Sequence, residues 1–359
     1  MTSIKDGENY APSSKVKPVI GHGQFQYAAV FLDHGHIIGQ CNGLNDAGAT
    51  LKWVYDPDPE RVARFCLKFP SVRVAKNFDE ILHDPLVQLV TSSAVPNQRA
   101  AIGCQVMKSG KHYFTDKSPF TSLIQLEEVR QVILSTGRKY MVYYAERLHN
   151  DAAWIAGDLI GERAIGDVLQ VVNLAPHRLA AETRPSWFMD KSCYGGILTD
   201  IGSHQVEQFL SYTNCSDATI NFARAENLYH QDIPGLQDFG EFSMIGSNGA
   251  SFYTRVDWFS PEGLRTWGDG RTFVLGTDGT IEIRKYIDIA RMAPASKLFI
   301  VTADGEQEID CLGRSGFPFF GQFILDCVNG TEFAMTQAHA LKAAELSMRA
   351  QELADYQPK

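Results

Sequence analysis

The stretch QYAAVFL at residues 26–32, followed by the turn DHGH at residues 33–36, decides the fold. A short apolar run of this kind is typical of a strand buried in a parallel sheet, and residues 37–44 favour a helix. The same rhythm continues to about residue 145. We expect further strands at 51–55, 87–91, 112–115 and 140–144, and helices at 60–69, 79–82, 98–109 and 123–136. This alternation predicts an α/β domain built on a parallel sheet with helices on both faces.

The pattern changes after Glu146. A helix at 154–160, a strand at 168–174 and a helix near residue 200 precede segments that favour antiparallel strands, with turn pairs between them. The expected strands are 219–228, 240–245, 250–257, 272–275, 279–284 and 297–301, and the closing helices are 321–327 and 336–354. The sequence therefore predicts a second, α+β domain with an open, mainly antiparallel sheet.

The expected segments are a leader at 1–24, a first domain at 25–147 and a second domain at 148–359. The leader is interpreted as flexible, because it is mostly polar at its start and lacks the apolar core of a secretory signal. The chain of 359 residues is long for one hydrophobic core, which favours two domains.

Charge, cysteine content and hydropathy argue against several classes of partner and site. The net charge of -9 argues against a nucleic-acid or anionic-membrane partner. The seven cysteines are scattered, odd in number and free of any C-x-x-C pair, which is typical of reduced thiols in a cytoplasmic protein. We therefore expect neither a disulfide framework nor a metal site. No apolar run approaches the ~18 residues that a membrane-spanning helix needs.

Ligands of open α/β sheets bind beyond the carboxyl ends of the strands, so the first turn is a candidate cofactor loop. Of the G-x-G-x-x-G dinucleotide pattern it keeps only Gly35 and Gly39, and Asp33 stands where backbone amides should meet a pyrophosphate. The segment Gly21-His22-Gly23 precedes the strand and is interpreted as an ordinary loop.

Asp56 ends the second expected strand, roughly 20 residues later, where an acid accepts the ribose hydroxyls of NAD. A carboxylate there would repel the 2′-phosphate of NADP, and the nearest arginine, Arg61, is five residues on. The alternative is that Asp56 caps the following helix. Residues ending the third strand are further candidates, or ordinary turn residues. The candidate cofactor-binding residues are Asp33, His34, Gly35, His36, Ile37, Asp56, Ser93, Pro96, Asn97, Asp116 and Lys117.

Lys117 follows the fourth strand expected for the first domain. Its ammonium group could bind a substrate hydroxyl and stabilise the alkoxide as hydride leaves. The alternative is a solvated lysine in a turn.

The stretch YGGILTDIGSH at residues 194–204 carries the second candidate site. Asp200 and His204 are four residues apart, so one helix would present both on one face as an acid/base pair. The preceding glycines would let the backbone approach a ligand closely. Two alternatives are a buried histidine with a capping aspartate, and half of a metal site, for which no second ligand cluster lies nearby in sequence.

Together, Asp116-Lys117, the segment RPSWF at 184–188 and the G-G-x-x-x-D-x-G-x-H stretch resemble the Gfo/Idh/MocA oxidoreductases over residues 25–355. The resemblance implies an N-terminal Rossmann domain and a C-terminal α/β domain whose open sheet forms dimer contacts. It also implies oxidation or reduction of one carbon of a sugar, inositol or related polyol with NAD(P). We therefore expect a homodimer or homotetramer that assembles through the C-terminal sheet.

Carried over by position, Lys117 matches the lysine of the family's E-K-P motif, with Asp116 in place of glutamate. Asp200 and His204 match its catalytic pair. The implied substrate-binding residues are Lys117, Glu146, Arg147, His177, Arg184, Trp187, Asp200 and His204. The chain departs from the pattern at Ser118, where the family has proline, and at the missing first glycine of the nucleotide loop.

These features predict an NAD-dependent dehydrogenase of a cyclic polyol or sugar, with NAD rather than NADP as cofactor. His204 would take the proton of the substrate hydroxyl, Lys117 would offset the alkoxide charge or accept that proton itself, and Asp200 would position His204 or hold a neighbouring hydroxyl. One alternative is an NAD-dependent glycosidase or eliminating enzyme that oxidises its substrate transiently. Another is a catalytically inactive nucleotide-sensing regulator, which the incomplete glycine loop would suit.

Overall fold

The computed structural model describes residues 16–291 and 295–356, and the expected leader therefore lies mostly outside the described residues. The chain divides into two compact units, each described by itself. The Rossmann unit comprises described residues 16–143 and 317–340. The sheet unit comprises described residues 144–291, 295–316 and 341–356.

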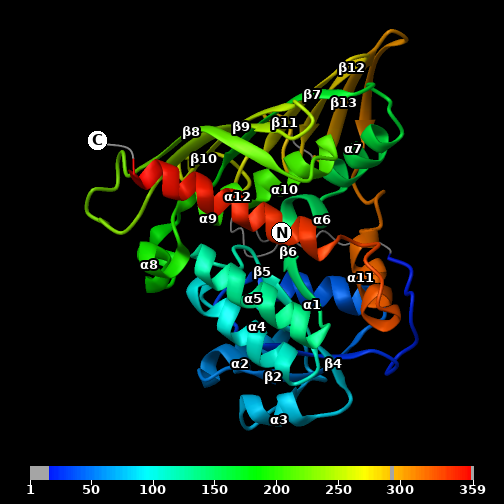
Figure 1. Cartoon of the computed structure of the whole chain (residues 1–359), viewed down its shortest axis with the longest axis vertical. Coiled ribbons are helices and arrows are strands. Elements are labelled where there is room, and N and C mark those ends of the chain that lie inside the picture. Colours follow the sequence, from blue (N-terminus) through cyan, green and yellow to red (C-terminus); the bar gives the residue numbers. More distant parts are fainter. Residues whose placement is uncertain (1–15, 292–294, 357–359) are drawn as a thin grey trace. The chain divides into compact units, whose positions relative to one another are not determined.

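The Rossmann unit has a six-stranded sheet in the order β3-β2-β1-β4-β5-β6, in which all neighbours are parallel. Its strands are β1 (Gln26–Val30), β2 (Thr50–Tyr55), β3 (Arg73–Val74), β4 (Val87–Ser92), β5 (His112–Asp116) and β6 (Tyr140–Tyr143). Its helices are α1 (His36–Asp46), α2 (Pro59–Lys68), α3 (Phe78–His83), η1 (Pro96–Gln98), α4 (Arg99–Lys108), α5 (Leu123–Thr136) and α11 (Pro318–Asn329). This confirms the predicted doubly wound α/β architecture (Figure 1).

The strand order reverses between β1 and β4. These two strands are parallel neighbours, so their carboxyl ends lie side by side at the same end of the sheet. In sheets of this kind, ligands bind beyond the strand ends at that reversal. Strands β5 and β6 are buried along their whole length, because helices cover both faces of the sheet.

The Rossmann unit also includes residues 317–340, which were expected in the second domain. The reason is aromatic packing by α11. The rings of Phe319 and Phe323 lie 6.0 and 5.2 Å from the ring of Phe114 on β5. The ring of Phe320 lies so close to Gly43 in α1 that a Cβ atom there would meet it at 2.3 Å.

The sheet unit has an eight-stranded sheet in the order β14-β13-β12-β11-β7-β10-β9-β8. The β7–β10 pair is parallel and the other neighbours are antiparallel, which confirms the predicted mainly antiparallel sheet. Its strands are β7 (Val168–Pro176), β8 (Ala218–Glu226), β9 (Phe239–Gly246), β10 (Ser251–Asp257), β11 (Arg271–Gly276), β12 (Gly279–Arg284), β13 (Lys297–Thr302) and β14 (Gly305–Asp310). Its helices are α6 (Ala145–Leu148), α7 (Asp151–Gly161), η2 (Ala181–Thr183), η3 (Ser186–Met189), α8 (Lys191–Tyr194), α9 (Ile197–Asp200) and α10 (Gly202–Thr213), and most of α12 (Gln337–Tyr356).

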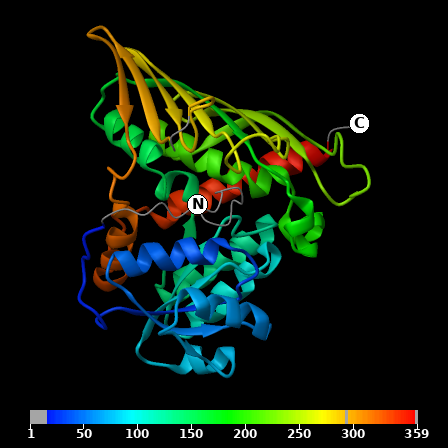
Figure 2. The same cartoon turned by 180° about the vertical axis from the view of Figure 1, so that it is seen from behind.

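One face of this sheet is covered by helices and the other is open. Helices α7, α9 and α10 lie on the same side of the strands in both views (Figure 1 and Figure 2). Side chains alternate accordingly along β9 and β11, with every second residue buried. The open face carries exposed apolar side chains from several strands, namely Phe222, Ile245, Phe273, Leu275 and Val301.

Candidate active site

Asp56 joins the ends of β1 and β2 in the Rossmann unit. Its Oδ2 accepts the Leu32 amide at 2.6 Å and its Oδ1 accepts the Asp58 amide at 2.8 Å. Asp58, not Asp56, caps α2, because its Oδ1 accepts the Glu60 amide at 2.9 Å. The capping alternative for Asp56 is therefore wrong. A carboxylate offers about four acceptor positions, so Asp56 retains capacity for hydroxyl donors.

Arg61 lies among three carboxylates at the same strand ends. Its Nη1 is 2.5 Å from Asp33 Oδ1 and 3.6 Å from Asp56 Oδ1, and its Nε is 3.5 Å from Asp58 Oδ2. Burial raises the pKa of Asp33, and Arg61 opposes that rise. One guanidinium against three carboxylates leaves this group with a net negative charge when all are ionised.

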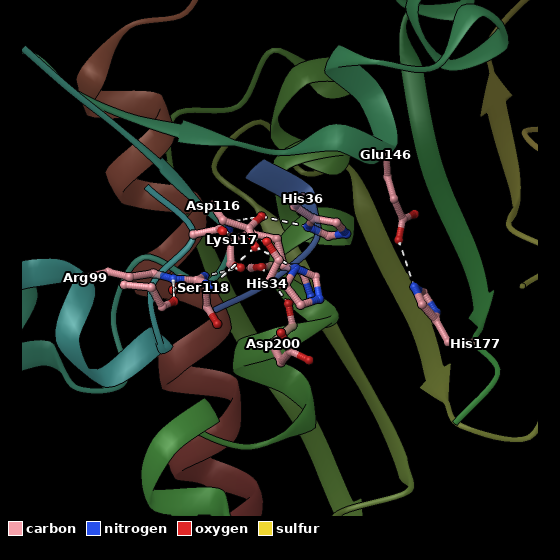
Figure 3. Close-up of polar contacts among 12 residues, drawn as sticks. His34, His36, Arg99, Asp116, Lys117, Ser118, Glu146, His177 and Asp200 are labelled. Atoms are coloured by element: carbon pink, nitrogen blue, oxygen red, sulfur yellow. Dashed lines mark hydrogen bonds and ion pairs between the residues drawn. The ribbon is translucent and has the colours of Figure 1, made fainter. Parts of the chain in front are cut away.

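Two histidines of the first turn meet Asp116 at the end of β5 (Figure 3). Nδ1 of His36 is 2.8 Å from Asp116 Oδ1, and Nδ1 of His34 is 3.2 Å from Asp116 Oδ2. Burial, followed by the neighbouring His36, lowers the pKa of His34 to about 3, so His34 is neutral near pH 7. Burial alone would raise the pKa of Asp116, but His36 and Arg99 outweigh it and hold the pKa well below its usual range.

Arg99 on α4 completes this network and is only 1 % exposed. It donates to Ala94 O at 2.6 Å, to Ser118 O at 3.0 Å and to Lys117 O, and its Nη2 lies 3.3 Å from Asp116 Oδ2. The peptide bond between Lys117 and Ser118 that it contacts is cis. Sequence reasoning missed Arg99. A signal was present, because a cation in the first turn of a helix opposes the helix dipole and therefore calls for a compensating anion.

His34, His36 and Asp116 place three possible metal-ligand atoms within 4.8 Å of one another. In this structure the same carboxylate also receives the Lys117 amide at 2.8 Å and faces the Arg99 guanidinium. The carboxylate of this group thus already faces donors from other parts of the Rossmann unit.

Lys117 is 7 % exposed, so the alternative of a solvated turn lysine is wrong. Among the other predicted cofactor residues, Ser93 and Pro96 are buried and Asn97 is half-buried. Ser93 Oγ donates to His34 O at 2.6 Å, which fixes the first turn against the end of β4. Ile37 is buried in the first turn of α1, and Gly35 stands at the N-cap of that helix.

Asp200 and His204 lie in the sheet unit, where the predicted single helix is interrupted. Helix α9 ends at Asp200 and α10 begins at Gly202. The His204 amide donates to Ile201 O at 3.1 Å, three residues back, and Ser203 Oγ donates to Asp200 O at 2.9 Å. The prediction of one continuous helix is therefore wrong, although Asp200 and His204 are both buried at the junction.

The glycines before Asp200 also have a different role from the predicted one. Gly196 has φ +97°, and a Cβ atom there would lie 2.3 Å from the side chain of Gln351 on α12. Gln351 Oε1 accepts the Leu198 amide at 3.0 Å. The close approach that the glycine permits is thus made by Gln351, not by a ligand.

Glu146 and His177 come together in the sheet unit (Figure 3). Glu146 Oε1 lies 3.6 Å from His177 Nε2, and Glu146 Oε2 accepts from Lys285 Nζ at 2.8 Å and Gln205 Nε2 at 3.0 Å. Burial would raise the pKa of Glu146, but Lys285, His204 and His177 outweigh it and hold the pKa below its ordinary value. Lys285 was missed because the pair Arg284-Lys285, at the end of β12, has the composition of an exposed strand end.

The remaining predicted substrate residues are engaged within the sheet unit. Arg147 forms a two-point ion pair with Glu207, with Nε 2.8 Å from Oε1. The guanidinium of Arg184 lies 4.6 Å from the ring centre of Phe188, and Arg184 Nε donates to Leu179 O at 3.0 Å. The half-buried Trp187 follows in the same segment. Because Lys117 belongs to the Rossmann unit and His204 to the sheet unit, their convergence stays a prediction.

Comparison with known protein families finds two matches. Residues 19–144 match the model described as "Oxidoreductase family, NAD-binding Rossmann fold", and residues 155–282 match the model of the GFO/IDH/MocA C-terminal domain. A crystal structure from Erwinia carotovora atroseptica SCRI1043, described only as that of a candidate oxidoreductase, is similar with a TM-score of 0.89 and 42% identity. That similarity covers 92% of this chain and 98% of the other.

Two more distant relatives are named for an activity on a sugar or polyol. Scyllo-inositol 2-dehydrogenase (NADP(+)) IolW of Bacillus subtilis (strain 168) is 27% identical over 182 residues, which are 49% of this chain and 50% of that protein. The chain thus spans half or less of the curated relatives that it matches. A levoglucosan dehydrogenase in complex with NADH and levoglucosan shares the fold, with a TM-score of 0.77, 17% identity and coverage of 92% and 97%. Among the described helices, none is both long and apolar enough to cross a membrane.

Proposed function

Because this chain belongs to the Gfo/Idh/MocA oxidoreductase family, we propose that it transfers hydride between NAD and a ring carbon of a sugar, inositol or related polyol. The observation that carries the proposal is Lys117. It is a buried lysine at the carboxyl end of β5, and Arg99 holds its backbone. A buried cation there suits an anion that develops during reaction better than it suits a packing role.

The Rossmann unit fits a dinucleotide in three respects. Its strand order is the dinucleotide-binding one, and Gly35 places no side chain at the N terminus of α1, where a pyrophosphate can meet backbone N–H groups. Asp56 is fixed at the end of β2, where its oxygens would accept ribose hydroxyls. The nicotinamide group, when bound, supplies the acceptor or donor of hydride.

We propose NAD rather than NADP because of the charges around Arg61. The 2′-phosphate of NADP would enter a group in which Asp33, Asp56 and Asp58 outnumber one guanidinium. The relative from Bacillus subtilis is named for NADP(+). Comparing the rates of NADH and NADPH formation tests the proposed preference of this chain.

The proposed chemistry uses residues of both units. His204 removes the proton of the substrate hydroxyl while the carbon that bears the hydroxyl loses hydride, and the Lys117 ammonium group stabilises the alkoxide that forms. In the alternative, Lys117 is a neutral amine and itself accepts the proton. Asp200 orients His204 or holds a neighbouring hydroxyl. The buried pair of Glu146 and His177 offers further acceptors for substrate hydroxyls.

The test is a panel of sugars, inositols and sugar acids, screened for formation of NADH and NADPH by absorbance. Activity with at least one polyol is expected, and His204→Ala should lower turnover far more than it weakens NADH binding. Equal loss of both would mean that His204 is structural. Absence of turnover with every compound, in either direction, would contradict the proposal.

The same residues would serve an enzyme that oxidises its substrate transiently and then eliminates a substituent. Steady accumulation of NADH supports the simple dehydrogenase, whereas product formation without net NADH favours elimination. A nucleotide-sensing regulator would need no buried lysine at the strand ends, and Lys117 therefore argues against that alternative.

The open face of the sheet unit supports a further proposal, assembly of two copies of this chain through that face. Its exposed aromatic and aliphatic side chains come from neighbouring strands, as at Phe273 and Leu275 on β11. Contiguous apolar surface of this kind is characteristic of interaction sites. Light scattering after size-exclusion chromatography measures the oligomeric state.

A further inference from the structure

The main chain of Lys117 is held on both sides by buried side chains. Its amide donates to Oδ1 of Asp116 at 2.8 Å, and its carbonyl oxygen accepts from Nη1 of Arg99. Nη2 of Arg99 lies 3.3 Å from Oδ2 of Asp116, so these three residues form a closed ring of contacts (Figure 3). All three are buried, so bulk water does not compete for these contacts. The ring therefore fixes the backbone from which the Lys117 ammonium group extends.

His36 joins this ring from the first turn of the Rossmann unit. It is the first residue of α1 and is buried, and its Nδ1 lies 2.8 Å from Oδ1 of Asp116. Although burial opposes ionisation, His36 and Arg99 hold the pKa of Asp116 well below its usual range, so both carboxylate oxygens only accept hydrogen bonds. Nδ1 of His36 is therefore the donor, whether the ring is neutral or charged. One carboxylate oxygen thus receives both the first turn and the amide of Lys117.

The first turn is itself anchored to the sheet, beside the end of β4. Ser93 Oγ donates to His34 O at 2.6 Å, and the Ser93 amide donates to Phe31 O at 3.2 Å. His36 therefore cannot follow the Asp116 carboxylate if that group turns, because the turn that carries His36 is tied to another strand. The N terminus of α1, where the pyrophosphate of the dinucleotide is proposed to bind, is thus connected to the end of β5 through His36.

We propose that His36 is a positioning residue that, through Asp116, holds the backbone of Lys117 in the orientation needed for catalysis. The proposal rests on the proposed function, in which the Lys117 ammonium group stabilises the alkoxide. Without the donor on His36, the Asp116 carboxylate loses the partner that fixes it from the first turn, and the Lys117 amide loses a fixed acceptor. A catalytic group displaced by about 1 Å can cost roughly 100-fold in rate. The contact therefore links the turn proposed to bind the cofactor with the group proposed to stabilise the alkoxide.

Asparagine and glutamine distinguish the two ring nitrogens of His36. The amide nitrogen of asparagine is as many bonds from Cβ as Nδ1 is, whereas that of glutamine is as many bonds away as Nε2. His36→Asn should therefore keep the hydrogen bond to Asp116, and His36→Gln should lose it. Both side chains are uncharged and polar, so the comparison isolates the position of the donor.

Hydrogen exchange measures the anchoring of Lys117 without any need for turnover. Exchange is followed by mass spectrometry, with fragmentation of the peptides that span β5 and residue 117 to resolve the Lys117 amide. His36→Gln should speed exchange of this amide about tenfold or more, as expected when a hydrogen bond to a charged group is lost, whereas His36→Asn should stay within about threefold of wild type. If β1, β4 and β5 exchange faster in parallel, His36 is structural and the proposal is wrong. Equal exchange at Lys117 in the two variants would also overturn it.

Kinetics with a polyol that the screen identifies give the second measurement. His36→Gln should lower kcat about 10- to 100-fold, while the affinity for NADH, measured by fluorescence, falls by no more than about threefold. His36→Asn should recover most of kcat. A loss of NADH affinity as large as the loss of kcat in His36→Gln would assign His36 to cofactor binding and overturn the positioning role.

Two further variants complete the design. His230→Gln breaks a contact of the same kind in the sheet unit, where Nδ1 of His230 lies 2.9 Å from Oδ2 of Asp238, and it should leave exchange at Lys117 unchanged. Faster exchange at Lys117 in this variant too would overturn the proposal. If His36→Gln does not fold, Ser93→Ala takes its place, because it removes only the Oγ anchor of the first turn. Ser93→Ala should speed exchange at Lys117 by a smaller factor, and unchanged exchange would overturn the proposal.

Lys117→Met separates this proposal from the proposed function. It should abolish turnover but retain NADH binding. If Lys117→Met turns over polyol as fast as wild type, or if the wild-type protein turns over none, the proposed function is refuted, and exchange of the Lys117 amide in the His36 variants still decides whether His36 holds Lys117. If Lys117→Met is inactive while His36→Gln keeps both its kcat and slow exchange, the positioning role alone is refuted.

Discussion

Replacing Arg99 by leucine should destabilise the Rossmann unit by about 3–5 kcal/mol. Arg99 is 1 % exposed and its guanidinium serves Asp116 and the carbonyl oxygens of Ala94, Lys117 and Ser118. Removing one partner of a buried ion pair typically costs roughly 3–5 kcal/mol. Here His36 still faces Asp116, but the carbonyl oxygens of Ala94, Lys117 and Ser118 lose their Arg99 donor as well. For a unit of this size, each kcal/mol lowers the melting temperature by about 2–4 °C, so a fall of about 6–20 °C is expected.

The assay is equilibrium urea unfolding at neutral pH, followed by circular dichroism and by hydrogen exchange of peptides from β5. Arg99→Lys keeps a charge beside Asp116 but loses the planar fork, so its effect should be intermediate. Arg64→Leu is the matched control, because its pair with Glu60 is exposed and 3.9 Å apart, and its change should stay within about 0.5 kcal/mol. A loss for Arg99→Leu below about 1 kcal/mol would refute the assigned role.

Three further predictions concern the cofactor, pH and assembly. Asp33→Asn should raise the ratio of NADPH affinity to NADH affinity about tenfold, because Arg61 could then make one charge-assisted hydrogen bond to the 2′-phosphate. Fluorescence titration with each nucleotide measures the two affinities. Equal changes in both affinities would contradict the prediction. Burial lowers the pKa of His149 from 6.5 to about 3. The unfolded chain therefore binds a proton below pH 6.5 that the folded chain does not, and stability falls as pH drops toward 3. Between pH 6.5 and about 5, the free energy of unfolding of the wild-type protein should fall by about 2 kcal/mol more than that of His149→Gln. Urea unfolding at each pH measures this difference. An identical dependence of the free energy of unfolding on pH in both proteins would refute the assignment. Phe273→Glu on the open sheet face should shift the protein toward monomer in light scattering, and an unchanged mass would exclude this face.

The alternation of strands and helices was readable from the sequence because buried parallel strands are short apolar runs between polar turns. Two strands were not predicted from the sequence. Strand β3 has two residues, both exposed, and β14 (GEQEID) is polar and largely exposed, so neither has an apolar pattern. The packing of α11 on the Rossmann unit was also missed, since periodicity reports which face is apolar but not which partner covers it.

The sequence predicted the site residues that follow strand ends. It did not predict the side chains that form hydrogen bonds and ion pairs with those residues. Lys117 and Glu146 follow strands of the kind that carry ligands. Arg99 and Lys285 reach their partners from 17 and 139 residues away in sequence, respectively. Such contacts depend on tertiary packing. The position of Arg99 in the first turn of a helix was the one sequence signal for its buried ion pair, whereas nothing in the sequence around Lys285 separates a buried lysine from a solvated one. The Asp58 cap was missed because two aspartates in the same turn offered equal local chemistry.

The packing of α11 has a consequence for synthesis on the ribosome. The aromatic side chains that close over Phe114 and Gly43 belong to residues 318–329, so they emerge only after nearly all of the sheet unit has been made. At roughly 5–20 residues per second, the nascent nucleotide-binding half waits on the order of ten seconds or more with an aromatic groove uncovered. A chain stalled in that interval offers chaperones that bind unfolded chains a hydrophobic target that the finished protein no longer shows.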